Sequence, residues 1–214
     1  LDIIAVEDNT TVEITPSGPT TNGWTAGSTN TVLMNKGQIY QLLGTHNNTA
    51  TGGLYYGTDL TGTKIRSVAT GSSSCKRIAV FSGAGKMKIG ANCSNNNSSD
   101  NLYQQLYPAV SWGKNYLTVP SYSRPLNYYR IIKKDPATNV YVNGTLVNPA
   151  SFVNSRFYEF SGNTPNKITA DQPISVAQFF TTAGCDGNVN PYDPDMIVLN
   201  PLEQTISKVT LVSS

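Results

Sequence analysis

The stretch LYPAVSWGKNYLTVPS, residues Leu106–Ser121, returns in degenerate form as LNPLEQTISKVTLVSS, residues Leu199–Ser214. Leucine, proline, valine and serine recur at matching places, always 93 positions apart (106 to 199). A fixed internal offset is the mark of a chain built from a repeated unit. The sequence therefore predicts related units and a chain that stops where a further unit would begin.

Composition excludes several classes of protein. Only 13% of the 214 residues are charged and the net charge is +2, so nothing favours nucleic acid or an anionic membrane surface. No apolar run approaches the length of a membrane span, so we expect no membrane insertion. Asn, Thr, Ser and Gly take the place of hydrophobic residues, which is typical of extracellular β proteins. We expect a piece of a longer secreted protein.

Short alternating runs between turn clusters predict an all-β fold with almost no helix. The run Thr11–Ile14 puts Val12 and Ile14 on one face, and Asn143-Gly144 predicts a tight hairpin. A second hairpin is predicted around Ala84, with its strands on either side of Gly83–Gly85.

Further paired motifs extend the repeat. Residues 3–14 resemble residues 130–142, and Lys64-Ile65 resembles Lys167-Ile168. The simplest account is a pair of tandem, jelly-roll-like β-sandwich units at residues 1–111 and 112–214, related by internal duplication. The alternative is a propeller- or prism-like arrangement of such units. The extra residues of the first unit are polar and Gly-rich, so we place them on surface loops.

Ordered motifs along nearly the whole chain carry a family resemblance: EDNTTVEI, NKGQIYQL, RIAVFSG, DNLYQQLYP, ADQPISVAQF and DPDMIVLNPLEQ. The chain resembles the IgG Fc-binding protein N-terminal domain family, and most of all its bacterial, Bacteroidetes-type members in long surface proteins with gliding-type sorting domains. The resemblance implies a non-catalytic extracellular adhesion or structural module at the cell surface. It does not imply immunoglobulin binding, and no binding residue carries over.

The chain has three cysteines, and its polar composition disfavours the alternative that all three are reduced, as in a cytosolic protein. Cys75 and Cys93 lie equally far from Ala84, so the predicted hairpin would bring their sulfurs together at its open end. The competing pair is Cys93 with Cys185, which occupy nearly equivalent places in the two units. Cys185 is otherwise free or bonded outside this chain.

The Asx- and Pro-rich run from Asp186 to Asp195 offers the best candidate metal site. Its likeliest Ca²⁺ ligands are the side chains of Asp186, Asn188, Asn190 and Asp193. The spacing is not that of an EF-hand, and a plain Asx-rich turn is the alternative.

No residue pattern indicates an enzyme or a bound cofactor other than that Ca²⁺. The one histidine, His46, lies in a polar insert, and no nucleophile-elbow motif occurs. Trp24, Tyr55 and Tyr56 are candidates for sugar stacking, with core packing as the alternative. We therefore expect an adhesion or structural module, or else a carbohydrate- or glycoprotein-binding module. Its partners would be a surface protein or glycan and the neighbouring domains of its own chain.

Overall fold

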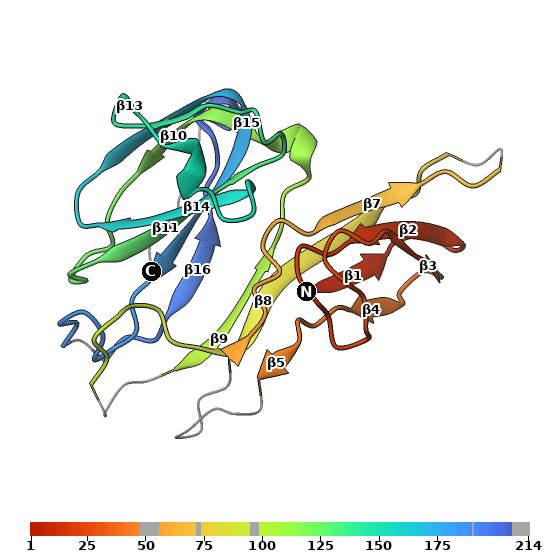
Figure 1. Ribbon diagram of the computed structural model, residues 1–214, viewed down its shortest axis with the longest axis horizontal. Coiled ribbons are helices and arrows are strands. Elements are labelled where there is room, and N and C mark those ends of the chain that lie inside the picture. The colour runs from red at the N-terminus through yellow and green to blue at the C-terminus, as the bar shows by residue number, and fades with distance from the viewer. Residues whose placement is uncertain (48–55, 72–73, 95–98, 190, 207–214) are drawn as a thin grey trace. The chain divides into compact units, whose positions relative to one another are not determined.

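The computed structural model describes residues 1–47, 56–71, 74–94, 99–189 and 191–206 (Figure 1). Within these ranges the chain forms strands and three short 3₁₀ turns but no α-helix, which confirms the all-β prediction. The 3₁₀ turns are η2 (Ala109–Ser111), η3 (Pro149–Ser151) and η4 (Leu202–Gln204). None of the described helical segments is long and apolar enough to cross a membrane.

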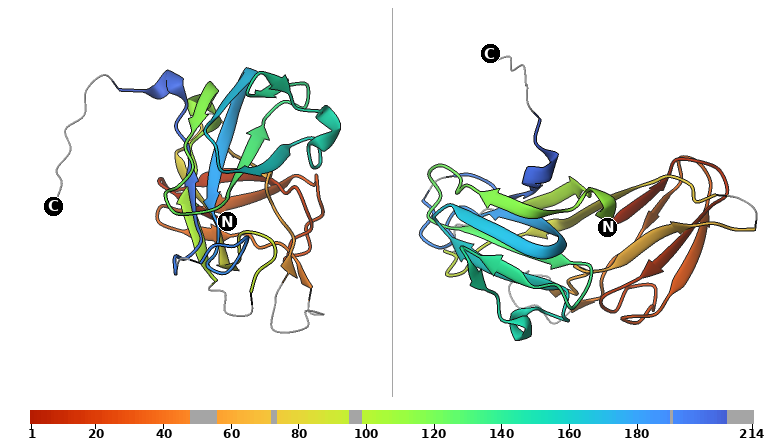
Figure 2. Two further views of the ribbon diagram at one scale, coloured as in Figure 1. Left: turned by 90° about the vertical axis from the view of Figure 1, so that its left-hand side faces the viewer. Right: turned by 90° about the horizontal axis from the view of Figure 1, so that it is seen from above.

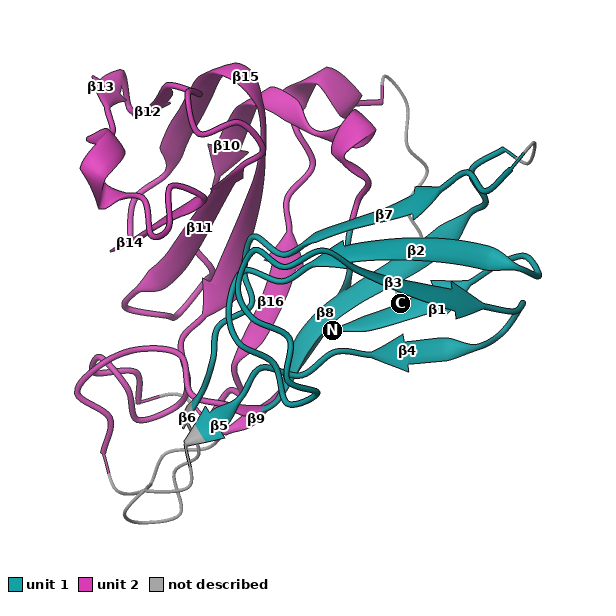
Figure 3. Cartoon of the chain, turned by 45° about the vertical axis from the view of Figure 1, so that its right-hand side comes forward, with its two compact units in different colours: residues 1–85, 102–106 teal, residues 86–101, 107–214 magenta. Residues whose placement is uncertain are grey.

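The chain divides into two compact units (Figure 3). Unit 1 comprises Leu1–Gly85 and Leu102–Leu106, and unit 2 comprises Lys86–Asn101 and Tyr107–Ser214. These units follow contacts between residues, whereas the boundary after residue 111 was drawn from sequence repetition. That boundary stays a prediction.

The described residues of unit 1 form two sheets and a short ribbon, and two strands of the larger sheet each have two of their residues in unit 2. Its larger sheet has the order β4-β1-β8-β9, and its three-stranded sheet has the order β3-β2-β7. The strands are β1 (Asp2–Ala5), β2 (Thr10–Thr15), β3 (Asn30–Met34), β4 (Ile39–Gln41), β7 (Lys64–Val68), β8 (Ile78–Met87) and β9 (Asp100–Gln105). The ribbon pairs β5 (His46–Asn47) with β6 (Tyr56–Gly57).

The core of unit 1 draws side chains from both sheets. Ile3 of β1 and Val12 and Ile14 of β2 are fully buried in one cluster. Glu13, between the two buried residues of β2, points the other way and forms an ion pair with Arg66 of β7 at 2.7 Å. This alternation follows from the strand period of two, as the sequence predicted.

Unit 2 contains one seven-stranded sheet, with the order β13-β12-β15-β11-β14 and with β10 and β16 also paired to β15. Its strands are β10 (Gly113–Thr118), β11 (Asn127–Lys133), β12 (Val140–Val142), β13 (Thr145–Leu146), β14 (Phe157–Gly162), β15 (Asn166–Phe180) and β16 (Asp195–Val198). The first half of β15 pairs with β12 and β10, and its second half with β11 and β16 (Figure 2). The sheet therefore curls around its own core.

The core of unit 2 gathers Tyr116, Ile131, Val140, Ile168 and Val176, all almost fully buried. Two sheets share one core in unit 1, whereas a single curled sheet encloses the core of unit 2. The two units are thus not identical two-sheet sandwiches. Their tandem relation and the propeller-like alternative stay predictions.

The Asn143-Gly144 hairpin is confirmed. Val142 of β12 pairs with Thr145 of β13, and both loop residues have positive φ, 52° and 81°. These are the backbone angles that a type I′ turn needs, and Asn and Gly tolerate them best.

The hairpin predicted around Ala84 is wrong. β8 runs without a turn from Ile78 to Met87 and pairs with β9. Position 83 requires a glycine because β9 passes close by. A Cβ atom at this position would collide with the carbonyl oxygen of Leu102. Gly83 therefore permits a close approach of two strands, and Gly83–Gly85 does not mark a turn.

Candidate functional site

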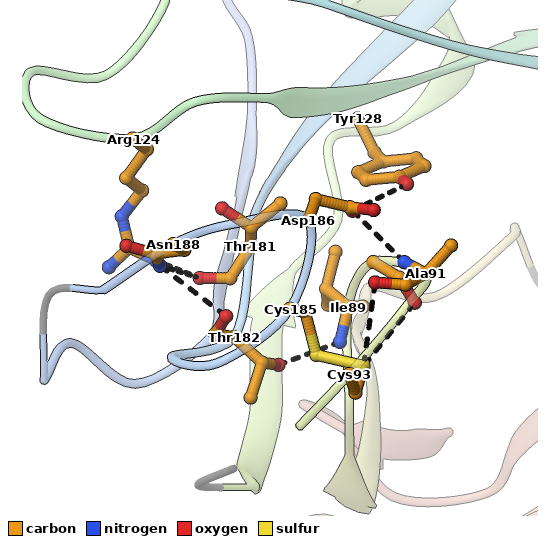
Figure 4. Close-up of a disulfide and its surroundings, with 11 residues drawn as sticks. Ile89, Ala91, Cys93, Arg124, Tyr128, Thr181, Thr182, Cys185, Asp186 and Asn188 are labelled. Atoms are coloured by element: carbon orange, nitrogen blue, oxygen red, sulfur yellow. Dashed lines mark hydrogen bonds between the residues drawn. A yellow bond between two sulfur atoms is a disulfide. The ribbon is translucent and has the colours of Figure 1, made fainter.

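A loop after β15 is tied to a second loop of unit 2 by main-chain hydrogen bonds. Thr182 donates to the carbonyl oxygen of Ile89 at 2.9 Å, and Ile89 donates back to the Thr182 hydroxyl at 2.8 Å. Asp186 does the same with Ala91: its N–H donates to the Ala91 carbonyl, and its carboxylate accepts from the Ala91 N–H, both at 2.9 Å. We call residues 89–94 and 181–188 together the clasp (Figure 4).

A disulfide between Cys93 and Cys185 closes the clasp (Figure 4). The predicted Cys75–Cys93 bond is therefore wrong, and the competing pair is the one that forms. Cys75 is an exposed free thiol. The reason is the continuous strand β8: since the chain does not turn back at Ala84, Cys75 and Cys93 are not opposite each other.

Inside the clasp, polar groups hold the loop in a tight turn. Asn188 is buried, and its side-chain amide donates to the carbonyl oxygens of Thr181 and Thr182 at 3.2 and 3.4 Å. The Asp186 carboxylate also accepts from the Tyr128 hydroxyl at 2.9 Å. Burial raises the pKa of Tyr128 to about 12, and the hydrogen bond to Asp186 adds to the rise.

These contacts bear on the predicted calcium ligands. The Asp186 carboxylate serves two protein donors, and the Asn188 side chain faces the buried turn. Asp193 contributes its main-chain carbonyl to a hydrogen bond from Arg124 at 3.0 Å, and Asn190 lies outside the described residues. Within the described ranges no three His, Cys, Asp or Glu side chains gather as a metal site. The calcium site stays a prediction, and the contacts favour the Asx-rich turn that was its alternative.

Beside the clasp, unit 2 has an open groove of about 590 Å³. Its lining combines carboxylates, one guanidinium, two aromatic rings and small polar groups: Asp100, Asn101, Ser121, Arg124, Phe180, Tyr192, Asp193, Pro194 and Asp195. The end of β15, the segment after it and the start of β16 supply five of these nine residues, and β9 supplies Asp100 and Asn101. The segment between β10 and β11 supplies Ser121 and Arg124.

Arg124 organises the groove. Its guanidinium lies 5.5 Å from the ring centres of both Phe180 and Tyr192, and it donates to the carbonyl oxygens of Thr181 and Asp193. Burial lowers the pKa of Arg124, and the carboxylate of Asp195 opposes that shift. Arg124 remains a cation at neutral pH because a guanidinium titrates far above that range. The groove thus offers a fixed positive centre between two rings, with carboxylates around it.

Of the predicted aromatic ligands, Trp24 does not line this groove. Trp24 stacks on Tyr40 in unit 1, with ring centres 5.8 Å apart, and packs against the unit 1 core. Tyr55 lies outside the described residues, and Tyr56 belongs to β6 by its backbone. Trp24 therefore has the packing role that was the alternative.

Of the groove residues, sequence reasoning singled out Asp193, as a calcium ligand, and missed Arg124, Phe180 and Tyr192. Tyr192 lies inside the Asx-rich run that predicts a calcium site, and its side chain is 50% exposed. Nothing in that run indicates a role for an aromatic ring. Nothing local marks Arg124, because its ring partners lie more than fifty positions away along the chain. An arginine in a polar segment is ordinary until the fold places rings on both sides of it.

Comparison with known proteins adds the family. The family model described as IgGFc binding protein matches residues 1–214, the whole chain. The chain belongs to the IgGFc-binding family. No curated protein and no solved structure matches it significantly. The resemblance read from the sequence motifs is confirmed.

Family membership and the disulfide together indicate the class of module and the compartment in which it works. Members of this family are generally non-catalytic binding modules. A disulfide persists in oxidising compartments, so the bond and the family both indicate an extracellular or secreted setting.

Proposed function

We propose that this domain is an extracellular adhesion module that holds a cell-surface protein or glycoprotein partner in the unit 2 groove. The observation that carries the proposal is Arg124 held between Phe180 and Tyr192 in an open groove with carboxylates on its walls. Arginine and tyrosine are the side chains that most often dominate binding energy at protein interfaces.

Rigidity of the groove supports recognition. The clasp and its disulfide lie directly before Tyr192 and Asp193 in the chain, and Arg124 ties the same segment from the other side. A binding surface that is already ordered loses less conformational entropy when a partner binds. The groove is therefore suited to recognition without rearrangement.

The second candidate is a glycan as the bound group, and Tyr192 favours it. A half-exposed ring beside carboxylates fits a sugar, whose apolar face stacks on aromatics and whose hydroxyls donate to acidic oxygens. Both candidates use the same groove residues, so they are distinguished by whether binding depends on the glycan of the partner.

The test applies the full chain to a glycan array and to a panel of glycoproteins, each before and after enzymatic deglycosylation. Tyr192→Ala should weaken binding by about tenfold or more if the groove is the site. The matched control is Tyr107→Ala, which removes another exposed tyrosine of unit 2 that does not line the groove.

Binding that Tyr192→Ala and Tyr107→Ala reduce equally would contradict the groove as the site. Binding lost on deglycosylation would select the glycan. Binding that survives deglycosylation but not Tyr192→Ala would select the protein surface.

We also infer that the domain contains an internal duplication, which suits a structural surface module. The pairing registers support it. Ile14 pairs with Ile65 in unit 1 as Val142 pairs with Ile168 in unit 2. The orders β4-β1-β8-β9 and β14-β11-β15-β16 correspond strand by strand.

The 3₁₀ turns agree with the same duplication. η2 and η4 each follow an extended proline, Pro108 and Pro201, at the offset found in the sequence. An experimental structure in which these paired elements ran in unrelated directions would contradict the duplication.

A further inference from the structure

Strand β7 forms one edge of the three-stranded sheet of unit 1 (Figure 3). Among the described residues β2 is the only strand that pairs with it. The nearest other contact is a hydrogen bond from the Lys76 N–H to the Ser67 hydroxyl at 3.0 Å, which involves a side chain of β7 and adds no strand. An unpaired edge presents main-chain N–H and C=O groups to any extended segment that fits.

The corresponding strand of unit 2 is covered on both sides. The first half of β15 pairs with β12 on one side and β10 on the other. Tyr116 of β10 lies opposite Ile168, and these two side chains are 1% and 0% exposed. Tyr116 also donates its hydroxyl to the Ile174 carbonyl at 2.6 Å. β10 thus completes both the sheet and the core around Ile168.

Ile65 is the residue of unit 1 that corresponds to Ile168, and it is only partly buried. The difference has a direct cause, because no described strand takes the place of β10 beside β7. A strand with an apolar residue opposite Ile65 would bury the exposed part of that side chain.

A segment of this chain has the required pattern. Thr205–Ser214 follows η4 as Trp112–Ser121 follows η2, and the second of these contains β10. The inward positions of β10, Tyr116 and Thr118, correspond to Val209 and Leu211. Lys208 precedes Val209, and Thr210 lies between Val209 and Leu211. Apolar and polar residues therefore alternate as in a strand with one buried face.

We propose that segment 205–214 of one copy of this domain adds to the β7 edge of a second copy as an antiparallel strand. In the register of β10 on β15, Val209 lies opposite Ile65, and Thr210 lies opposite Lys64. Lys208 then faces Arg66, whose charge Glu13 already balances. Main-chain hydrogen bonds supply affinity, and the alternate side chains Val209 and Leu211 supply register.

This contact is head-to-tail, because the donating segment and the accepting edge are different surfaces of the same molecule. Such contacts form closed rings, of which a reciprocal pair is the smallest, or open chains of copies. Domains on a cell surface would thereby be joined end to end.

Cysteine trapping tests the proposal in the full chain. Cys75→Ser removes the free thiol, and Lys64→Cys with Thr210→Cys places one thiol on the edge and one on the segment. After mild oxidation, non-reducing gels should show a ladder of disulfide-linked dimers and longer species. The matched control replaces Lys64→Cys by Thr31→Cys, which puts the thiol on β3, the opposite edge of the same sheet, and should leave at least about tenfold less ladder.

A second measurement uses the segment as a fluorescent peptide, Thr205–Ser214, with the full chain carrying Val209→Asp and Leu211→Asp as the acceptor. The peptide should bind saturably, and the same two substitutions in the peptide should weaken binding by about tenfold or more. Lys208→Ala in the peptide is the outward-facing control and should change affinity less than about threefold.

Three results would overturn the proposal: an equal ladder from the Thr31→Cys control, a bridge closed within single chains, or a peptide whose binding ignores Val209 and Leu211.

Discussion

Strands β7 and β15 have different surroundings: β7 is an edge strand of a three-stranded sheet, whereas β15 lies inside a seven-stranded sheet. β15 runs unbroken for 15 residues, pairs with β10, β11, β12 and β16, and ends at a loop closed by a disulfide. β7 is 5 residues long, ends before a loop, and pairs with one described strand. The comparison teaches that unit 2 is the preorganised half, whereas unit 1 keeps an edge open for pairing.

The largest expected effect on this comparison comes from removing the disulfide that closes the clasp. The Cys93–Cys185 bond joins residues 92 positions apart, and cross-linking a loop of that length contributes about 4.6 kcal/mol in the chain-entropy model. Cys93→Ser with Cys185→Ser should lower the free energy of unfolding by about that amount, measured by urea denaturation. The control Cys75→Ser, at an exposed free thiol, should change it by less than about 0.5 kcal/mol. Equal losses in both proteins would mean that the bond does not form as described.

The second test compares Ile65 of β7 with Ile168 of β15, the two isoleucines that the proposed duplication aligns. Ile168→Ala empties a fully enclosed position and should cost about 3 to 4 kcal/mol of unfolding free energy. Ile65→Ala removes a side chain that is already partly in water and should cost about half as much. Denaturant midpoints of the two variants, taken at one low protein concentration, provide the measurement. If Ile65→Ala proved the more damaging, the β7 edge would be better covered than described.

A third, smaller effect concerns the close approach of β8 and β9 in unit 1. Gly83→Ala pushes a methyl group into the Leu102 carbonyl and should destabilise the fold by about 2 kcal/mol. Gly85→Ala, two residues along the same strand, meets no atom within 4 Å and should be close to neutral. Thermal melts of this pair separate backbone crowding from the general effect of glycine replacement. Two identical melting temperatures would contradict the crowding.

The smallest effect is the titration of the Tyr128 phenol in the clasp. Its pKa is about 12 in the folded protein, against about 10 for an unfolded chain. The folded state therefore holds the proton to higher pH, so this contribution to stability is complete below about pH 10 and is lost as the pH rises towards 12. Tyr128→Phe should remove that part of the alkaline loss of stability.

Asp186→Asn provides a companion measurement, because it removes the carboxylate that the Tyr128 hydroxyl contacts. The phenolate absorbance of Tyr128 should then develop at lower pH than in the unchanged protein. An unchanged titration would place the cause in burial alone.

The sequence by itself determined the strand content and the family. Val12 and Ile14 are buried, and Asn143-Gly144 turns a hairpin, because side-chain alternation and turn angles are decided by residues close together in the chain. The ordered motifs identified the family for a similar reason, since they can be read directly along the chain.

Only the tertiary structure decided the disulfide and the groove. Spacing around Gly83–Gly85 suggested a turn, yet these residues lie within a continuous strand. Gly83 is crowded there by Leu102, a neighbour that the local sequence does not reveal. Cys93 forms its disulfide with Cys185, 92 positions away in the sequence. Connectivity among several cysteines does not follow from spacing alone. Arg124 likewise contacts the rings of Phe180 and Tyr192 only because the fold brings distant segments together. Local patterns set which segments are strands, but contacts between distant segments depend on how the whole chain packs.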